Sequence, residues 1–296
     1  MREDDNDSIS TLLTDAIEAF LKDRIDDKLR DVTVEFYAER LDTFSDAHRN
    51  RTLDDFTRGD VMKWALARPG AKSTRKGYLN SIRAMFNWAH NQNPKLVRKD
   101  IGRGMTFRLP KQERNISILT PAEARLVMEQ AGKYAPCLAL MMFCGVRPSE
   151  VHGEEKPPLR WKQVHTDSSL IRINANQSKT RSARPMERLP PNLWAWLPDD
   201  VDPEAFISPA RSRQATLCGK AAIGHWPQDV CRHSFFTYFL AKYENIDRAM
   251  LIAGHEEKPS VMYKHYRGLA TSAEADEFFS IIQQGASCAY PKTPIQ

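Results

Sequence analysis

The sequence lacks the features that would place a protein in a membrane or build it around disulfides or zinc. No apolar run in its 296 residues approaches the ~20 residues that a membrane-spanning helix requires. The first residues, Met1–Asp7, are acidic and polar, unlike a secretory signal or a transit peptide. The five cysteines are odd in number, scattered and without a Cys-x-x-Cys pair, which excludes a disulfide framework and a zinc ribbon. We therefore expect a cytoplasmic protein with no membrane partner.

Acidic residues are also scarce in one segment of the chain. Residues 61–120 hold 13 Lys and Arg residues and only two acids, whereas residues 1–60 hold nine bases and 17 acids. A block of this kind is typical of a protein that binds the phosphate backbone of a nucleic acid, because each neutralised phosphate releases counterions. The alternative is an ordinary solvated helix face, but the near absence of acids favours nucleic acid.

The first part of the chain carries a helical pattern. Apolar residues recur at helical spacing over residues 8–31, 32–43, 52–67 and 73–91. The third of these segments is closed by Arg68-Pro69-Gly70, a strong helix breaker. The pattern predicts a small all-helical bundle over residues 1–102.

A basic, aperiodic stretch at residues 103–118 is the predicted linker, and a second domain is expected over residues 119–284. Thr120-Pro121-Ala122-Glu123 is a capping box that starts this domain. A buried helix is expected over residues 134–144, and period-two alternation predicts three antiparallel strands. The strands are residues 159–164, 169–174 and 184–189, and the later helices are 209–221, 230–243, 246–253, 260–267 and 272–284. The fold class is therefore mainly α with a small antiparallel sheet, followed by a loose tail at residues 285–296.

Four short segments of the second domain carry chemistry. They are Gly145-Val-Arg147-Pro-Ser-Glu150, Ser178-Lys179-Thr180, Asp229-Val-Cys-Arg232-His233, and Gly254-His255 followed by Tyr263-Lys-His-Tyr266. Guanidinium groups stay charged and match the geometry of phosphate oxygens, so two arginines suit displacement at a phosphodiester. A tyrosine nucleophile and a lysine or histidine acid complete that set without a metal or cofactor. The histidines near Cys231 have no zinc-finger spacing, and no metal site is expected.

Taken in order, these segments resemble the tyrosine recombinase (phage integrase) family. The family's pattern is Gly-x-Arg-x-x-Glu, a hairpin lysine, His-x-x-Arg-His, Gly-His, and a tyrosine about ten residues later. The resemblance covers essentially the whole chain, because the helical bundle is similar to the family's core-binding domain. It implies site-specific cutting and rejoining of DNA through a 3′-phosphotyrosine.

The resemblance also assigns the site residues. It implies that Arg147, Arg232 and His255 hold the scissile phosphate, that Lys179 protonates the leaving oxygen, and that Tyr266 attacks. Glu150 and His233 match supporting positions, and Glu150 would orient Arg147 or occupy a helix start. Each has a plainer alternative: Arg147 as a helix-end arginine facing the dipole, His255 as a structural histidine, and Lys179 as a solvated loop lysine.

Three points stay open on the sequence. Asp229 stands where the family has histidine or lysine, and a carboxylate does not donate to a phosphate; it would cap a helix or hold Arg232. Tyr263 lies one helical turn from Tyr266 and competes as the nucleophile. Arg181 or Arg184 competes with Lys179 for the hairpin position.

Double-stranded DNA is the expected partner, and by resemblance the working unit is a tetramer associated with the nucleoid. The residues expected to contact DNA phosphates are Lys72, Arg75, Lys76, Arg83, Arg108 and Lys111. The amphipathic segment 272–284 would either be exchanged between neighbouring subunits or pack on its own domain. Alternative functions are a DNA-binding protein of the same fold with impaired catalysis, motivated by Asp229, and a type IB topoisomerase.

Overall fold

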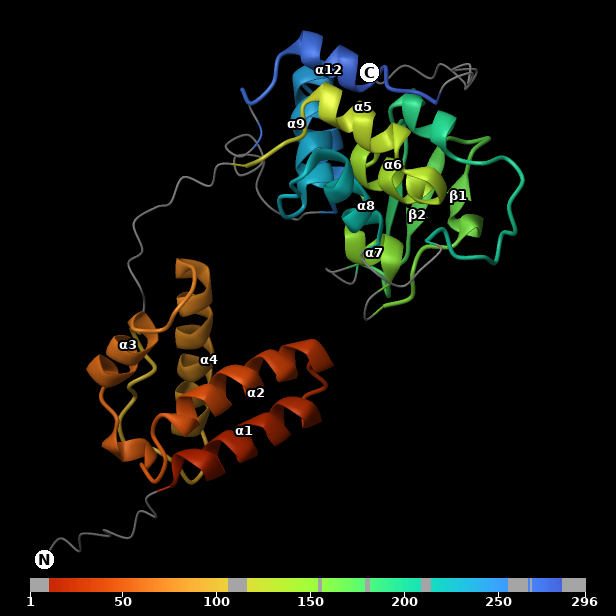
Figure 1. The fold of residues 1–296 in the computed structure, drawn as a ribbon. Helices are drawn as coiled ribbons and strands as arrows, with labels where there is room; N and C mark the ends of the chain where they lie inside the picture. The colour runs from red at the N-terminus through yellow and green to blue at the C-terminus, as the bar shows by residue number, and fades with distance from the viewer. Residues whose placement is uncertain are drawn as a thin grey trace, which may run out of the picture. The chain divides into compact units, whose positions relative to one another are not determined.

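The protein consists of two compact units, Met1–Gln112 and Glu113–Gln296, each with its own hydrophobic core. The computed structural model describes residues 11–105, 116–153, 156–178, 182–208, 214–254, 266 and 268–283. Both units are built largely from helices, and the second also contains a three-stranded antiparallel sheet (Figure 1). The predicted fold class is therefore confirmed. Among the described helices, none is long and apolar enough to cross a membrane.

The first unit is a helical bundle, as predicted. It contains α1 (Leu13–Asp26), α2 (Asp31–Asp46), the 3-10 turn η1 (Leu53–Asp55), α3 (Arg58–Leu66) and α4 (Lys72–His90). Helices α1 and α2 lie side by side, and α4 packs against α1, α2 and α3 (Figure 1). The buried side chains between them are mainly aromatic and aliphatic, and they include Phe20, Phe44, Phe56 and Phe86.

The single helix expected over residues 52–67 is instead two short elements, η1 and α3. Two capping boxes follow each other here: the Asp55 carboxylate accepts from the backbone N–H of Thr52 at 2.7 Å, and that of Asp60 accepts from Thr57 at 3.0 Å. Each box starts a new helical turn, and Phe56 between them is extended (ψ 139°). Local capping thus overrides the helical period of the apolar residues.

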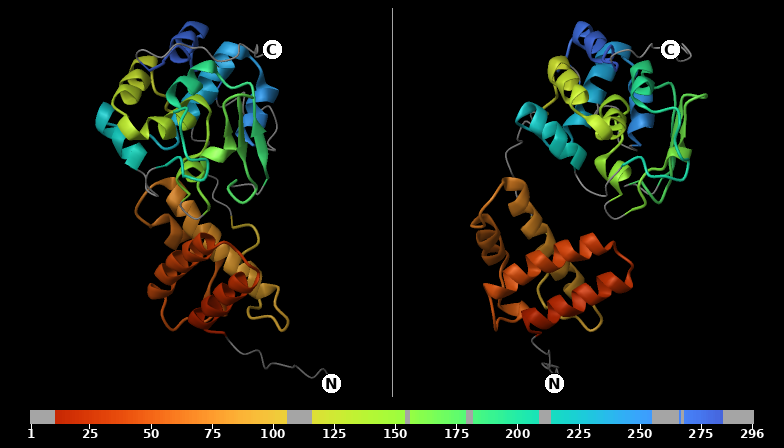
Figure 2. Two further views of the ribbon diagram at one scale, coloured as in Figure 1. Left: turned by 90° about the vertical axis from the view of Figure 1, so that its right-hand side faces the viewer. Right: turned by 45° about the vertical axis from the view of Figure 1, so that its right-hand side comes forward.

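The second unit contains the sheet and the remaining helices. Its elements are α5 (Pro121–Glu129), η2 (Gly132–Tyr134), α6 (Ala135–Phe143), α7 (Pro148–His152), η3 (Trp161–Gln163), β1 (Val164–His165), β2 (Leu170–Ile173), β3 (Arg184–Met186), η4 (Pro191–Trp196), α8 (Gln214–Ile223), α9 (Val230–Tyr243), α10 (Ile246–Ala253) and α12 (Ser272–Phe278). The strand order is β1-β2-β3, and Ile171 of β2 pairs with Val164 and Met186. The sheet lies at one side of this unit, with most of the helices beside it (Figure 2).

The predicted elements of the second unit are mostly confirmed. Helices α9 and α10 have the expected bounds, and the Thr120–Glu123 capping box is formed. The strand expected at residues 159–164 is wrong except for Val164, which begins β1: residues 161–163 form η3, because Gln163 accepts a hydrogen bond from the backbone of Arg160 at 3.1 Å and closes a turn. The helix expected over 272–284 ends at Phe278. The helix at 260–267, apart from Tyr266, and the tail at 285–296 lie outside the described residues.

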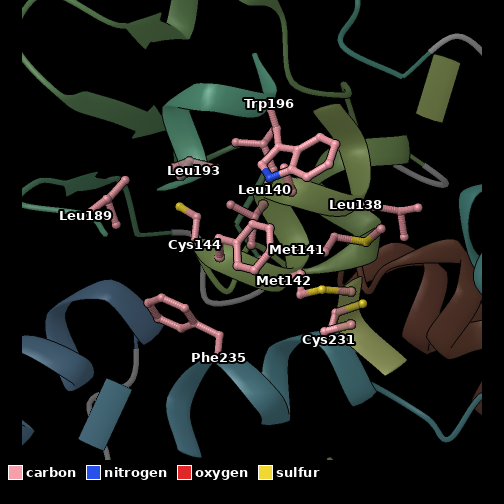
Figure 3. Packing of buried hydrophobic residues seen from close by; sticks show 14 of the residues in the cluster. Leu138, Leu140, Met141, Met142, Cys144, Leu189, Leu193, Trp196, Cys231 and Phe235 are labelled. Carbon is pink, nitrogen blue, oxygen red and sulfur yellow. The ribbon is translucent and has the colours of Figure 1, made fainter. Parts of the chain in front are cut away.

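Helix α6 forms the centre of the second core. Its side chains are buried from Cys137 to Phe143, between η4 and α9. Figure 3 shows Leu140 and Met141 lying between Trp196 of η4 and Phe235 of α9. Helix α9 is in turn covered by α12 of the same domain, where the Phe278 ring stacks on that of Tyr238 at 4.3 Å. Of the two arrangements expected for segment 272–284, the structure shows packing on its own domain.

Candidate active site

Arg147 lies on a tight turn between α6 and α7, and Glu150 lies within α7. Gly145 ends α6 with a positive φ of 69°, and a Cβ at this position would lie 2.6 Å from the Phe235 ring, so the turn requires glycine. Arg147 then occupies the N-cap position of α7. The Glu150 carboxylate accepts from the Arg147 backbone N–H at 3.0 Å and from its guanidinium at 3.3 Å. Glu150 therefore both starts α7 and contacts the arginine.

Arg184 joins this pair from β3, a contact that the sequence interpretation missed. Its guanidinium donates to both Glu150 carboxylate oxygens, at 2.9 and 2.7 Å, and its Nε donates to the Ile252 carbonyl at 3.1 Å. Arg184 is 6% exposed and Glu150 is fully buried. Charge-assisted, bidentate contacts of this kind are among the stronger hydrogen bonds in proteins. Arg184 is therefore a buried side chain whose hydrogen bonds are made within the protein.

Arg232 approaches the same place from the first turn of α9. Its guanidinium donates to the Gly145 carbonyl and, at 2.9 Å, to the Ala253 carbonyl at the end of α10. It also lies over the Phe236 ring, 4.7 Å from its centroid. Arg232 is only 6% exposed, and within the described part of the chain no carboxylate lies within ion-pair distance of it. A buried cation held by carbonyls alone is poised for an anion.

Arg147 and Arg184 both contact the buried carboxylate of Glu150, whereas Arg232 is affected by its charge without contacting it. Burial, followed by the charges of Arg147 and Arg184, lowers the pKa of Arg232 to about 9, while Glu150 and Tyr266 act in the opposite direction. Burial also lowers the pKa of Arg147, against the raising effect of Glu150. Burial raises the pKa of Glu150, but the hydrogen bonds and charge of Arg184 outweigh it and the net shift is downward. The cluster thus carries excess positive charge in a site of low dielectric constant.

Tyr266 lies beside this arginine cluster. Its hydroxyl and Nδ1 of His233 lie 3.1 Å apart in a hydrogen bond, and the two ring centroids are 5.8 Å apart. The Phe236 ring, which contacts Arg232 on α9, is also 5.8 Å from the Tyr266 ring. The structure therefore brings Tyr266, His233 and Arg232 together around α9.

Asp229 occupies the N-cap position of α9 in the left-handed conformation, with φ 54° and ψ 21°. Its side chain makes no capping hydrogen bond, and the residue is exposed. Its charge nevertheless raises the pKa of Arg147, so the carboxylate lies within electrostatic reach of the cluster. The capping hydrogen bond that the sequence suggested for Asp229 is therefore not formed. Its effect on Arg147 is electrostatic.

If the cluster binds DNA, as the sequence motifs predict, Asp229→Asn should bind it about twofold to fivefold more tightly at low salt, because the substitution removes a negative charge near Arg147. Asparagine tolerates the left-handed conformation, so the free energy of unfolding should change by less than about 0.5 kcal/mol. Fluorescence anisotropy with a labelled duplex at two salt concentrations measures the effect, which should shrink as salt screens the exposed charge.

The matched control is Glu244→Gln. Glu244 lies at the other end of α9, also in the left-handed conformation with φ 49°, and its removal changes net charge equally. Its DNA affinity should match that of the unaltered protein. An equal gain in both variants, or a loss of affinity in Asp229→Asn, would contradict a local effect on Arg147.

Lys179 and His255 lie outside the described residues, as do Tyr263, Thr180 and Arg181. The backbone that leads to Lys179 is described, and it is held by a buried pair of amides. Gln163 and Gln177 donate to each other's side-chain oxygens at 2.7 and 3.1 Å. Gln177 also donates to the Pro158 carbonyl at 3.0 Å and accepts from the backbone N–H of Asn174 at 3.1 Å. A fully satisfied network of this kind fixes the chain up to Ser178.

The basic residues predicted to contact DNA lie on α4, apart from Arg108 and Lys111, which are outside the described residues. Lys72 and Lys76 are exposed one turn apart. Arg75 and Arg83 are half-buried and donate to the carbonyls of Arg68 (2.8 Å) and Met105 (3.3 Å). Lys72 and Lys76 are therefore the better placed of the four for phosphate contacts. In the described part of the chain, no group of three or more His, Cys, Asp or Glu residues is arranged to hold a metal.

A scan against protein-family models finds no match, and neither does a search of curated proteins. Solved structures do match. The Tn1549 transposon integrase in complex with circular intermediate DNA is 18% identical, with a TM-score of 0.61 over 90% of this chain and 98% of that one. A lambda integrase dimer bound to a COC′ core site is 14% identical, with a TM-score of 0.69 over 88% and 98%.

A third match is the XerH site-specific recombinase bound to a palindromic difH substrate in a post-cleavage complex. It is 13% identical, with a TM-score of 0.58 over 84% of this chain and 79% of that one. The chain therefore has the fold of these integrases and recombinases, and the resemblance to the tyrosine recombinases that its motifs indicate is confirmed at the level of the fold.

Proposed function

We propose that this protein is a site-specific DNA recombinase that breaks and rejoins DNA through a 3′-phosphotyrosine on Tyr266. The observation that carries the proposal is the buried arginine cluster with a tyrosine hydroxyl beside it. Arg147 and Arg232 supply positive charge where a phosphodiester would develop negative charge, and His233 holds the tyrosine hydroxyl. Exposed basic residues alone would be enough to bind DNA. A buried arginine cluster beside a nucleophilic hydroxyl is suited to cleaving it.

The proposed reaction follows from these groups. The Tyr266 oxygen attacks the scissile phosphorus and forms a P–O bond, while the bond from phosphorus to the 5′-oxygen breaks. The tyrosine proton passes to Nδ1 of His233, which accepts it when the ring is neutral and protonated on Nε2. Lys179 and His255 are proposed in the roles that the resemblance implies, as the acid for the 5′-oxygen and as a phosphate donor.

The reverse reaction rejoins the strands. A free 5′-hydroxyl gives its proton to Lys179 and its oxygen forms a bond to phosphorus, while the bond from phosphorus to the Tyr266 oxygen breaks and His233 returns the proton to that oxygen. One phosphodiester is exchanged for another, so the proposed cycle needs neither ATP nor a divalent metal. The structural matches support the proposal, because they are DNA complexes of integrases and a recombinase. By extension we propose duplex DNA as the partner, a tetramer as the working unit, and a cytoplasmic, nucleoid-associated location.

A second candidate is a DNA-binding protein of the same fold with impaired catalysis. It is favoured by one observation, the carboxylate of Asp229 near Arg147 where a donor would be expected. That protein would bind duplex DNA normally and form no covalent bond with it.

A covalent trapping experiment distinguishes the two candidates. The protein is incubated in EDTA with a library of nicked duplexes of randomised sequence, in which a short cleaved strand diffuses away and prevents rejoining. We expect a protein–DNA adduct that survives denaturation, and the DNA recovered from it defines the target site. Peptide mapping should place the modification on the peptide that contains Tyr266. Sequence-selective binding of the library without any adduct would instead establish the DNA-binding protein.

A further inference from the structure

We infer that Arg184 is a positioning residue for the proposed cleavage reaction, acting through Glu150 and the end of α10 rather than on DNA. The inference rests on the proposed function, and it gives Arg184 a role different from the hairpin position for which the sequence made it a candidate. Arg184 lies at the point where β3, α7 and α10 meet. It thereby connects α7, whose N-cap is Arg147, with the end of α10, whose Ala253 carbonyl accepts from Arg232.

The first connection runs through Glu150. This carboxylate contacts Arg147 with one oxygen at 3.3 Å, while Arg184 holds both of its oxygens at 2.9 and 2.7 Å. Bidentate contact fixes the plane of the carboxylate as well as its position. The orientation of the Arg147 guanidinium is therefore set by a carboxylate that Arg184 orients.

The second connection runs through the last turn of α10. Arg184 donates to the Ile252 carbonyl, and Arg232 donates to the next carbonyl, that of Ala253. Gly254, which ends the helix with φ 61°, lies so close that a Cβ there would be 2.8 Å from Cδ of Arg184. A change in the position of Arg184 would therefore move the carbonyl that holds Arg232.

Arg184 itself has little capacity left for a phosphate. Its Nε and both terminal nitrogens are engaged with protein acceptors, and the side chain is 6% exposed. Displacing an active group by about 1 Å costs on the order of 100-fold in rate, even when the change lies away from the reacting atoms. We therefore expect substitution of Arg184 to lower the cleavage rate while DNA affinity is retained.

The test uses Arg184→Lys, which keeps the charge but has no fork to hold both oxygens of Glu150. On the DNA site recovered by covalent trapping, we expect a cleavage rate about 100-fold lower with DNA affinity within about twofold. A substrate with a methylphosphonate at the scissile position lacks the negative charge that Arg147 and Arg232 neutralise. On it the difference between variant and unaltered protein should fall below about tenfold, because the arginines then matter less.

The matched control is Arg248→Lys. Arg248 lies on α10 and donates to the Glu187 carbonyl just after β3, so it links α10 to the end of β3 without contacting Glu150. It should cleave both substrates at the rate of the unaltered protein. The inference is overturned if Arg184→Lys cleaves normally, if its defect is equal on both substrates, or if it and Arg184→Gln both lose the cooperative thermal transition. Failure of the unaltered protein to form an adduct would instead overturn the proposed function.

Discussion

Tyr266→Phe is expected to lower covalent adduct formation by more than about 10⁴-fold while DNA affinity stays within about twofold. Phenylalanine lacks the nucleophilic oxygen but keeps the ring that packs beside Phe236 and His233. The fold should therefore be retained, and phosphate contacts elsewhere should keep the affinity. Denaturing gels of the trapped complex measure the adduct, and electrophoretic mobility shifts measure binding of the same duplex.

Tyr263→Phe is the matched control, because it removes the hydroxyl of the tyrosine three residues earlier in the chain. It should form the adduct at the rate of the unaltered protein. If the adduct persists in Tyr266→Phe and disappears in Tyr263→Phe, the nucleophile is Tyr263. The hydrogen bond between Tyr266 and His233 favours Tyr266 as the nucleophile.

The helices were predictable from the sequence wherever apolar periodicity and capping agreed. A long run of mostly apolar residues follows Asp229 in α9, and a glycine follows the last residue of α10. The bounds of both helices were therefore predicted correctly. Periodicity failed where side chains hydrogen-bonded to the backbone nearby. Thr52 and Thr57 each restarted a helix, and Gln163 closed a turn where alternation predicted a strand.

The site was predictable in its residue types but not in its connections. Motif order singled out Arg147, Arg232 and Tyr266, whereas the partners of Glu150 depend on how β3 packs against α7. One signal was present in the sequence. Arg184 and Met186 are two residues apart on β3 and therefore lie on the same face of the strand. Because Met186 is a core residue, Arg184 also faces the interior. A buried arginine needs an acceptor, and Glu150 is the buried carboxylate available to it.

Arg232→Met is expected to lower the cleavage rate by about 10³-fold or more and to weaken binding to the cleavage site. The guanidinium is a buried positive charge, only 6% exposed, and loss of such a charge-stabilising donor typically costs on this scale. Single-turnover cleavage of the trapped site measures the rate. Arg232→Lys keeps the charge but cannot reach the carbonyls of Gly145 and Ala253 together, so it should lose at least about 10²-fold. If Arg232→Lys cleaved DNA at the full rate, the two donor nitrogens of the guanidinium would not be needed.

The same substitution has a pH signature in stability. Burial and the neighbouring arginines lower the pKa of Arg232 to about 9 in the folded protein, well below its ordinary value in the unfolded chain, so the unfolded chain binds more protons between the two. The contribution of Arg232 to the free energy of unfolding is therefore least favourable below pH 9 and rises above it. Relative to Arg232→Met, the unaltered protein should gain on the order of 1 kcal/mol between pH 7.5 and pH 10. Urea denaturation of both proteins at the two pH values measures the difference. A difference that is constant with pH would mean that the surroundings of Arg232 do not lower its pKa into this range.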